Sequence, residues 1–157
     1  MEAALRTAAD LIEGKDLKEI NYEKVRGQEG IKRATVEIAG KKVKIVVASG
    51  LGNARKILEE IKAGKADYQF VEIMACPGGC IMGGGQPIVK SSIKNFTNVH
   101  KLRADSLYSI DEKSTYRKSH QNQAVIQTYV DYLEKPGSEK SHKYLHTKYS
   151  KRKKYEI

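Results

Sequence analysis

The chain has 157 residues, of which 39% are hydrophobic and 31% are charged, and its formal net charge is +10. This length allows one hydrophobic core, since a domain of this size buries roughly two-thirds of the surface of its unfolded chain. No apolar run approaches the ~20 residues of a membrane span, and the first residues lack the pattern of a signal peptide. We therefore expect a cytoplasmic protein without a membrane span, whose thiols stay reduced.

The N-terminal segment, residues 1–14, has the periodicity of an amphipathic helix. Five apolar residues should share one face of it: Ala4, Leu5, Ala8, Leu11 and Ile12. Gly14 ends the helix, and no Ser, Thr, Asp or Asn precedes it to cap its first turn. We therefore interpret this helix as the continuation of a longer chain.

Residues 31–39 and 42–48 predict a β-hairpin. Apolar and charged residues alternate in these segments around Gly40. The second strand becomes wholly apolar from Ile45 onward. It should therefore be more buried than the first strand.

A glycine-containing turn, Gly50-Leu51-Gly52, leads into a predicted helix over residues 53–63. The apolar residues that should face inward are Ile57, Leu58 and Ile61. A strand, a glycine turn and a helix can also bind phosphate, but this turn lacks the third glycine and the lysine of nucleotide-binding loops. We interpret it as a connection between a strand and a helix.

Both cysteines lie in one loop, Cys76-Pro77-Gly78-Gly79-Cys80, which follows a predicted strand at residues 68–74. The ends of strands in α/β sheets are common places for binding sites. A disulfide is one possible use of the two thiols, but it would close a very small ring and stabilise the fold little. A zinc site is another, but zinc-binding cysteines usually have a closer C-x2-C or slightly wider spacing, and no His lies near this loop.

An iron-sulfur cluster suits this loop better. Thiolates hold such clusters, and backbone N–H groups of glycine-rich turns can approach the sulfides. A cubane cluster takes four thiolates, whereas the chain has only Cys76 and Cys80. The other ligands must come from another chain, a symmetry mate, a small molecule or a segment outside this sequence.

After residue 87 the sequence predicts helices joined by polar links, over residues 102–112, 122–134 and 138–149. Ser138 should cap the last of them. We therefore predict an α/β fold in which residues 1–87 form a lobe with a mixed sheet and flanking helices. Residues 88–157 should form a helical strap.

Basic residues gather in a C-terminal tail, at Lys148, Lys151, Arg152, Lys153 and Lys154. Such a tail can bind nucleic acid, but the chain has no Trp, only two Phe, and no stacking pattern among its nine Tyr. A solvated tail is the simpler interpretation, and docking of an acidic electron carrier is a third. We predict no nucleic-acid partner.

His142 and His146 are spaced as metal ligands on one face of a helix can be. No glutamate follows His142 directly, and the sequence offers no third ligand nearby. Hydrogen bonding at helix ends is therefore the simpler role for Ser141-His142, as for Ser119-His120.

Residues 72–87, Glu-Ile-Met-Ala-Cys-Pro-Gly-Gly-Cys-Ile-Met-Gly-Gly-Gly-Gln-Pro, resemble the last of the three cysteine segments that define the iron-iron (FeFe) hydrogenases. Residues 1–7 resemble the helix that follows the second cysteine segment of that family. Several downstream motifs of this chain resemble the C-terminal strap, or small subunit, of the same family: Arg103-Ala104, Leu107-Tyr108, Arg117-Lys118-Ser119-His120 with Asn122, Lys135-Pro136, Ser141-His142 and Leu145-His146-Thr147 with Tyr149. The resemblance covers almost the whole chain.

The resemblance implies a role for each residue of the cysteine loop. Cys76 would bind a 4Fe-4S cubane, and Cys80 would bridge it to a two-iron unit that carries carbon monoxide, cyanide and a dithiolate, the whole being the H-cluster. Met74 would pack against the two-iron unit, as a soft apolar side chain can. Five glycines would let backbone N–H groups approach the cluster, namely Gly78, Gly79, Gly83, Gly84 and Gly85. The implied reaction is the reversible reduction of protons to hydrogen by ferredoxin.

The two earlier cysteine segments of the family are missing from this sequence, and with them two cubane ligands and a proton-relaying thiol. The resemblance therefore implies a C-terminal fragment or subunit that is inactive without a complementing N-terminal segment or chain. One alternative is an iron-sulfur assembly module like the eukaryotic relatives of hydrogenases, against which the glycine-rich loop and the strap argue. Another is a sensory or regulatory subunit whose cysteines close a site between two copies of the chain.

Overall fold

The computed structural model describes residues 1–18, 21–22, 26–27 and 29–151. Its chain divides into two compact units, Met1–Arg117 and Lys118–Ile157. The expected boundary after residue 87 stays a prediction. Helix α4 (Val99–Lys113), in the first unit, contacts Ile81 through Arg103 and Arg6 through Asp111. Within the described residues, no helix combines the length and the apolar character that a membrane crossing needs.

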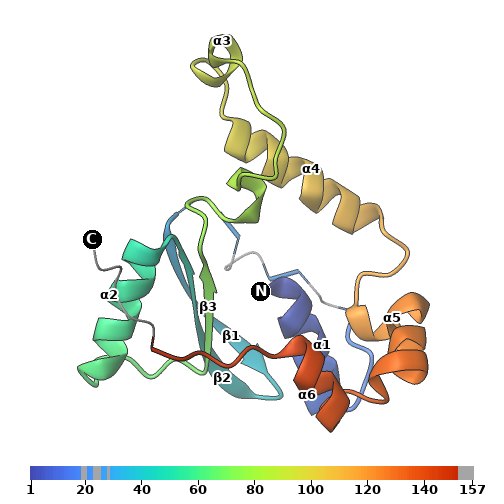
Figure 1. The fold of residues 1–157 in the computed structure, drawn as a ribbon. Coiled ribbons are helices and arrows are strands. Elements are labelled where there is room, and N and C mark those ends of the chain that lie inside the picture. The colour runs from blue at the N-terminus through green and yellow to red at the C-terminus, as the bar shows by residue number, and fades with distance from the viewer. Residues whose placement is uncertain (19–20, 23–25, 28, 152–157) are drawn as a thin grey trace. The chain divides into compact units, whose positions relative to one another are not determined.

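The first unit contains a three-stranded mixed sheet in the order β1-β2-β3 (Figure 1). Strand β1 (Ile31–Ile38) pairs antiparallel with β2 (Lys41–Ser49), and β2 pairs parallel with β3 (Phe70–Met74). Ala39 and Gly40 have positive φ angles of 50° and 71° in the tight turn between the first two strands. The predicted hairpin and the α/β class with a mixed sheet are confirmed.

The central strand β2 is the most buried, as its apolar sequence predicts. Its side chains point alternately to the two faces of the sheet. Ile45 packs in one apolar cluster with Leu5 of helix α1 (Glu2–Glu13). Val46 packs in a second cluster with Ile57 of helix α2 (Leu51–Lys62). The two helices therefore cover opposite faces of the sheet.

The two flanking helices bury less of their apolar surface than the sequence pattern predicts. In α1, Leu5 is buried but Leu11 and Ile12 are 73% and 61% exposed. In α2, Leu58 and Ile61 are 55% and 40% exposed. The expected inward position of Leu58 and Ile61 was wrong, because the described sheet of three strands covers only part of the apolar stripe of α2.

Two short helices and α4 complete the first unit. The 3-10 turn η2 (Cys80–Met82) and the short helix α3 (Ser91–Lys94) precede α4. The side chain of Asn98 caps α4 by accepting a 2.9 Å hydrogen bond from the Lys101 N–H. The helix is therefore longer than the predicted range of 102–112.

The second unit is helical. The 3-10 turn η3 (Ser119–Gln121) precedes α5 (Gln123–Thr128), which continues as a π-helical turn, η4 (Tyr129–Leu133). The last helix, α6 (Glu139–Leu145), is shorter than predicted. Its expected cap is confirmed, since the Ser138 hydroxyl accepts a 3.1 Å hydrogen bond from the Ser141 N–H. Residues 152–154 of the basic tail lie outside the described residues.

Candidate metal centre

The loop that follows β3 is folded by consecutive backbone hydrogen bonds. The Gly79 N–H donates to the carbonyl of Cys76 over 2.9 Å, and the Met82 N–H donates to Gly79 over 3.0 Å. The Gly83 N–H then donates to the carbonyl of Cys80 over 3.1 Å. These turns hold both cysteines in one compact structure at the end of the strand.

Gly78 and Gly79 are required by the conformation of this loop. Both have φ angles of 79°, in the left-handed region that side chains rarely adopt. A methyl group on Gly78 would lie 3.0 Å from the side chain of Met82, and one on Gly79 would lie 3.3 Å from the sulfur of Met74. The structure therefore gives both glycines a role in the turn and packs Met74 beneath it.

Gly83 lies against one of the thiols. A methyl group on Gly83 would be 3.3 Å from the Cys76 sulfur and 3.2 Å from the Cys80 carbonyl. Around Gly84 and Gly85, by contrast, the described residues leave open space. The three consecutive glycines therefore differ: the first packs on Cys76, and the other two face an unfilled region.

The glycines permit a test of this loop by its stability. Gly79→Ala should lower the free energy of unfolding by about 1–3 kcal/mol, because it forces a positive φ on alanine and crowds Met74. Gly84→Ala, in the same loop, should leave it unchanged. Urea unfolding of the two variants checks this. Equal stability of both would contradict the packing of the loop described above.

The two thiols are free, and Cys76 is half-buried whereas Cys80 is exposed. The described residues hold no group of three or more His, Cys, Asp or Glu side chains that could bind a metal ion. Cys76 and Cys80 can therefore supply two ligands of a larger site. His142 and His146, in the second unit, share a hydrogen bond with their Nδ1 atoms 2.8 Å apart.

Two residues that support the loop were missed by sequence reasoning. The Gly50 N–H donates a 2.8 Å hydrogen bond to the Met74 carbonyl, and Gly50 packs against Pro77. The Gly50-Leu51-Gly52 turn thus has a structural role as a connection, and it also anchors the cysteine loop. Arg103 of α4 donates to the carbonyls of Ile81 and Pro87, and its only sequence signal was its place in a resembling motif.

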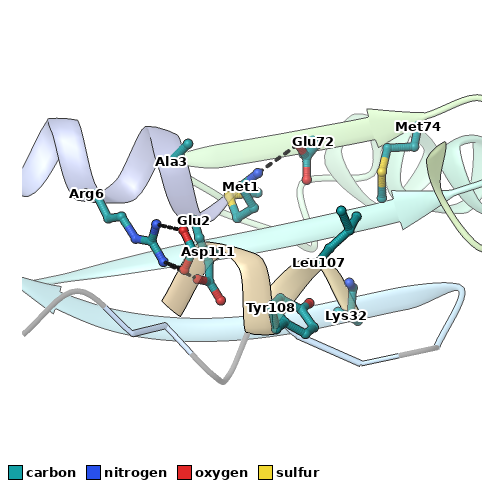
Figure 2. Close-up of a pocket in the computed structure, with 10 residues that line it drawn as sticks. All are labelled: Met1, Glu2, Ala3, Arg6, Lys32, Glu72, Met74, Leu107, Tyr108 and Asp111. Atoms are coloured by element: carbon teal, nitrogen blue, oxygen red, sulfur yellow. Dashed lines mark hydrogen bonds and ion pairs between the residues drawn. The ribbon is translucent and has the colours of Figure 1, made fainter. Parts of the chain in front are cut away.

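A cavity of about 350 Å³ lies beside Met74 in the first unit (Figure 2). Charged groups of both signs reach it, including Glu72 of β3 and Lys32 of β1. Burial lowers the pKa of the Lys32 ammonium, although Glu72 acts in the opposite direction. The Met74 thioether and Leu107 supply apolar surface on its wall.

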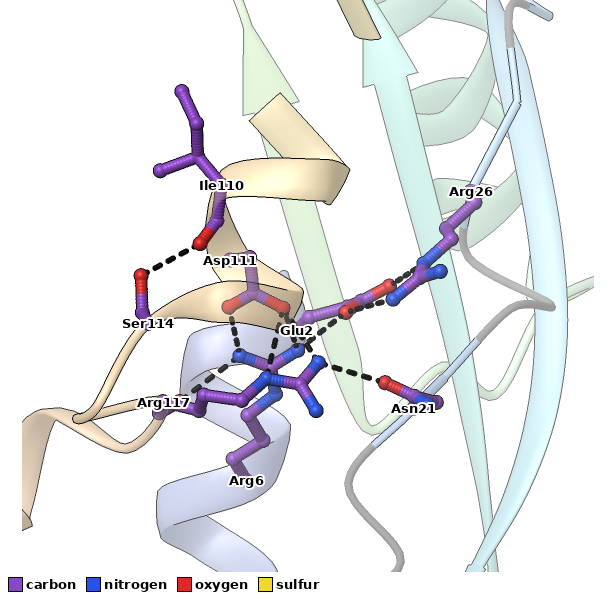
Figure 3. Close-up of polar contacts among 8 residues, drawn as sticks. All are labelled: Glu2, Arg6, Asn21, Arg26, Ile110, Asp111, Ser114 and Arg117. Carbon is purple, nitrogen blue, oxygen red and sulfur yellow. Dashed lines mark hydrogen bonds and ion pairs between the residues drawn. The ribbon is translucent and has the colours of Figure 1, made fainter. Parts of the chain in front are cut away.

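A buried arginine joins α1 to α4 next to this cavity (Figure 3). The Arg6 side chain is 4% exposed and donates to both oxygens of Asp111, over 2.6 and 2.9 Å. It also donates to Glu2, which forms a further ion pair with Arg26. Hydrogen bonds from Arg6, and then from Arg117, lower the pKa of Asp111 from 3.8 to about 2.

The sequence profile described as "Iron only hydrogenase large subunit, C-terminal domain" matches residues 1–84, more than half of the chain. The chain belongs to the iron-only hydrogenase family. A second profile, "Iron hydrogenase small subunit", matches residues 97–152. The two matches cover the cysteine loop and α4 respectively, so the Arg6–Asp111 pair joins the part of the chain that matches the large subunit to the part that matches the small subunit.

Three similar proteins define the relationship. Iron hydrogenase 1 of Clostridium pasteurianum is 44% identical over 151 residues, which are 96% of this chain and 26% of that protein. Protein NAR1 of Arabidopsis thaliana is 32% identical over 150 residues, 94% of this chain and 31% of that protein. A solved apo structure of the FeFe-hydrogenase HydA1 of Chlamydomonas reinhardtii has a TM-score of 0.71 and 37% identity, over 95% of this chain and 43% of that one. The chain thus spans about a quarter of the length of the Clostridium enzyme.

Proposed function

We propose that the chain is the part of an iron-only hydrogenase that supplies Cys76 and Cys80 to the active-site H-cluster. Cys76 serves as a ligand of the 4Fe-4S cubane, and Cys80 bridges the cubane to the two-iron unit. The observation that supports this most is the loop at the end of β3, in which the Cys76 sulfur packs on Gly83 while Cys80 is exposed.

The donor set fits part of such a cluster. Thiolates are the ligands that iron-sulfur clusters take, and the open space at Gly84 and Gly85 leaves their backbone free to approach one. Two of the four cubane thiolates are present, so the others come from the complementing segment. When bound, the cluster supplies the reversible reduction of two protons to hydrogen. The Met74 side chain shields the bound cluster from water. Ferredoxin is the proposed electron donor.

The complementing partner is the N-terminal hydrogenase segment, on the same or a second chain. Strand β3 lies at the edge of the sheet, and within the described residues no strand pairs with its outer side. Phe70, Val71 and Ile73 of β3 are exposed. An apolar edge of this kind is favourable for addition of further strands and costly to leave in water. The proposed setting is cytoplasmic, where thiols stay reduced and can bind such a cluster.

A second candidate function is iron-sulfur cluster assembly. The similarity to NAR1 covers 94% of the chain, and the protein named "Cytosolic Fe-S cluster assembly factor narfl" of Danio rerio is 32% identical over 90% of it. The strap therefore does not separate hydrogenases from these relatives, contrary to the expectation from the sequence. In this alternative Cys76 and Cys80 hold a cubane without a two-iron unit.

Iron stoichiometry tests the proposal. The chain is reconstituted under argon by itself, and separately co-produced with an N-terminal hydrogenase segment and the cluster-maturation proteins. The hydrogenase proposal predicts little iron on the isolated chain and full iron only in the complex. A cubane bridging two copies would give about two irons per isolated chain, since a cubane has four irons. A complex that binds a cubane but no further iron would favour the assembly function.

A further inference from the structure

Arg103 has an unusual set of contacts for an arginine on the surface of a helix. Its Nη1 donates a 2.9 Å hydrogen bond to the Ile81 carbonyl, and its Nη2 donates a 2.7 Å hydrogen bond to the Pro87 carbonyl. The same Nη1 lies 3.9 Å from the Met82 sulfur. Both ends of the guanidinium are thus used on the backbone of one loop.

The two carbonyls flank the glycine segment of the cysteine loop. Between them lies Gly83, whose Cα faces the Cys76 sulfur so closely that a methyl group would come within 3.3 Å of it. Arg103 therefore acts at both ends of the segment that covers Cys76. Lysine cannot replace it here, because one ammonium lacks the planar fork that reaches two acceptors at once.

The positive charge of Arg103 has no carboxylate partner in a salt bridge within the described residues. Its neighbour Lys101, by contrast, pairs with Asp105 over 2.6 Å. A positive charge held against the cysteine loop, at the carbonyls of Ile81 and Pro87, would stabilise a nearby cluster in its reduced, more negative state. Charge and hydrogen bonds around the sulfurs set cluster potentials.

We propose that Arg103 is a positioning residue, which closes residues 81–87 over Cys76 and so arranges the two cysteines for the cluster. The cluster part of this inference rests on the proposed function. The closure of the loop does not, and it is measurable in the chain without iron.

The first test measures the alkylation rates of Cys76 and Cys80 in the full chain, by iodoacetamide and mass spectrometry. Arg103→Lys should speed the modification of Cys76 about tenfold, the effect of losing one charge-assisted hydrogen bond. Arg103→Gln, which loses both, should speed it at least as much. The rate at the exposed Cys80 should change less than about twofold. Lys101→Gln, on the same helix, is the matched control and should leave both rates unchanged.

Unchanged reactivity of Cys76, or equal acceleration at both cysteines, would overturn the proposal, because general loosening of the fold affects both thiols.

The second test is the midpoint potential of the cubane in the complex with the complementing segment. Arg103→Gln should lower it, whereas Arg103→Lys should restore most of the potential but not the slow alkylation of Cys76. Selective acceleration, together with a complex that binds no cluster, would leave the positioning role standing and refute the proposed function.

Discussion

Alanine at Cys76 or at Cys80 should lower the iron affinity of the complex with the complementing segment by at least about 100-fold. Each substitution removes one of two thiolates, and the described residues hold no cluster of other ligands that could replace it. The remaining ligands would leave an iron of the cubane open to water. Iron and sulfide analysis of the purified complex measures the effect.

Gln86→Ala is the matched control for these variants, because Gln86 is exposed in the same loop and offers no thiolate. It should bind as much iron as the wild type. Retention of full iron by both cysteine variants would show that the cluster is held elsewhere. The loop would then have only a structural role.

Replacement of Asp111 should have the largest effect on stability. Asp111→Ala leaves the Arg6 guanidinium, 4% exposed, with only part of its negative partners. Removing one partner of a buried ion pair typically costs about 3–5 kcal/mol, and the remaining Glu2 contact places the expected loss near 3 kcal/mol. Urea unfolding at neutral pH measures it.

Acid should weaken the wild type through the same residue. The pKa of Asp111 is depressed in the folded chain to about 2, against a usual 3.8. Its stabilising contribution is therefore fully present above about pH 4 and is lost as the pH falls through about 2. The loss amounts to roughly 2 kcal/mol, and Asp111→Asn should not show it.

Asp105→Asn provides the comparison on the same helix, because Asp105 is exposed and its ion pair among the described residues is with Lys101. It should change the free energy of unfolding by less than about 1 kcal/mol. If Asp111→Ala were as mild as Asp105→Asn, the ion pair would not hold α1 to α4.

The sequence predicted the local part of this structure well. The alternating pattern around Gly40 led to the correct hairpin, and the apolar run from Ile45 correctly marked the most buried strand. The loop between Cys76 and Cys80 was found because its glycines and thiols are adjacent in the chain. These features depend on neighbours in sequence, which a sequence pattern describes directly.

Features that depend on distant residues were missed. Periodicity marked Leu11 and Leu58 as apolar, but it could not show that the sheet is too narrow to cover them. Arg103 contacts Ile81, and Arg6 contacts Asp111, across long stretches of chain. Nothing in the spacing of these residues indicates such contacts, so an arginine that positions a loop looks like any surface arginine.

Hydrogen evolution from a reduced viologen dye, under argon, tests the central claim most directly. The chain is co-produced with a hydrogenase N-terminal segment that carries the missing cysteines, together with the maturation proteins. The proposed function predicts hydrogen from this complex, none from either part alone, and none from the complex with Cys80→Ala. An iron-bearing complex that evolves no hydrogen, or activity that persists in Cys80→Ala, would contradict it.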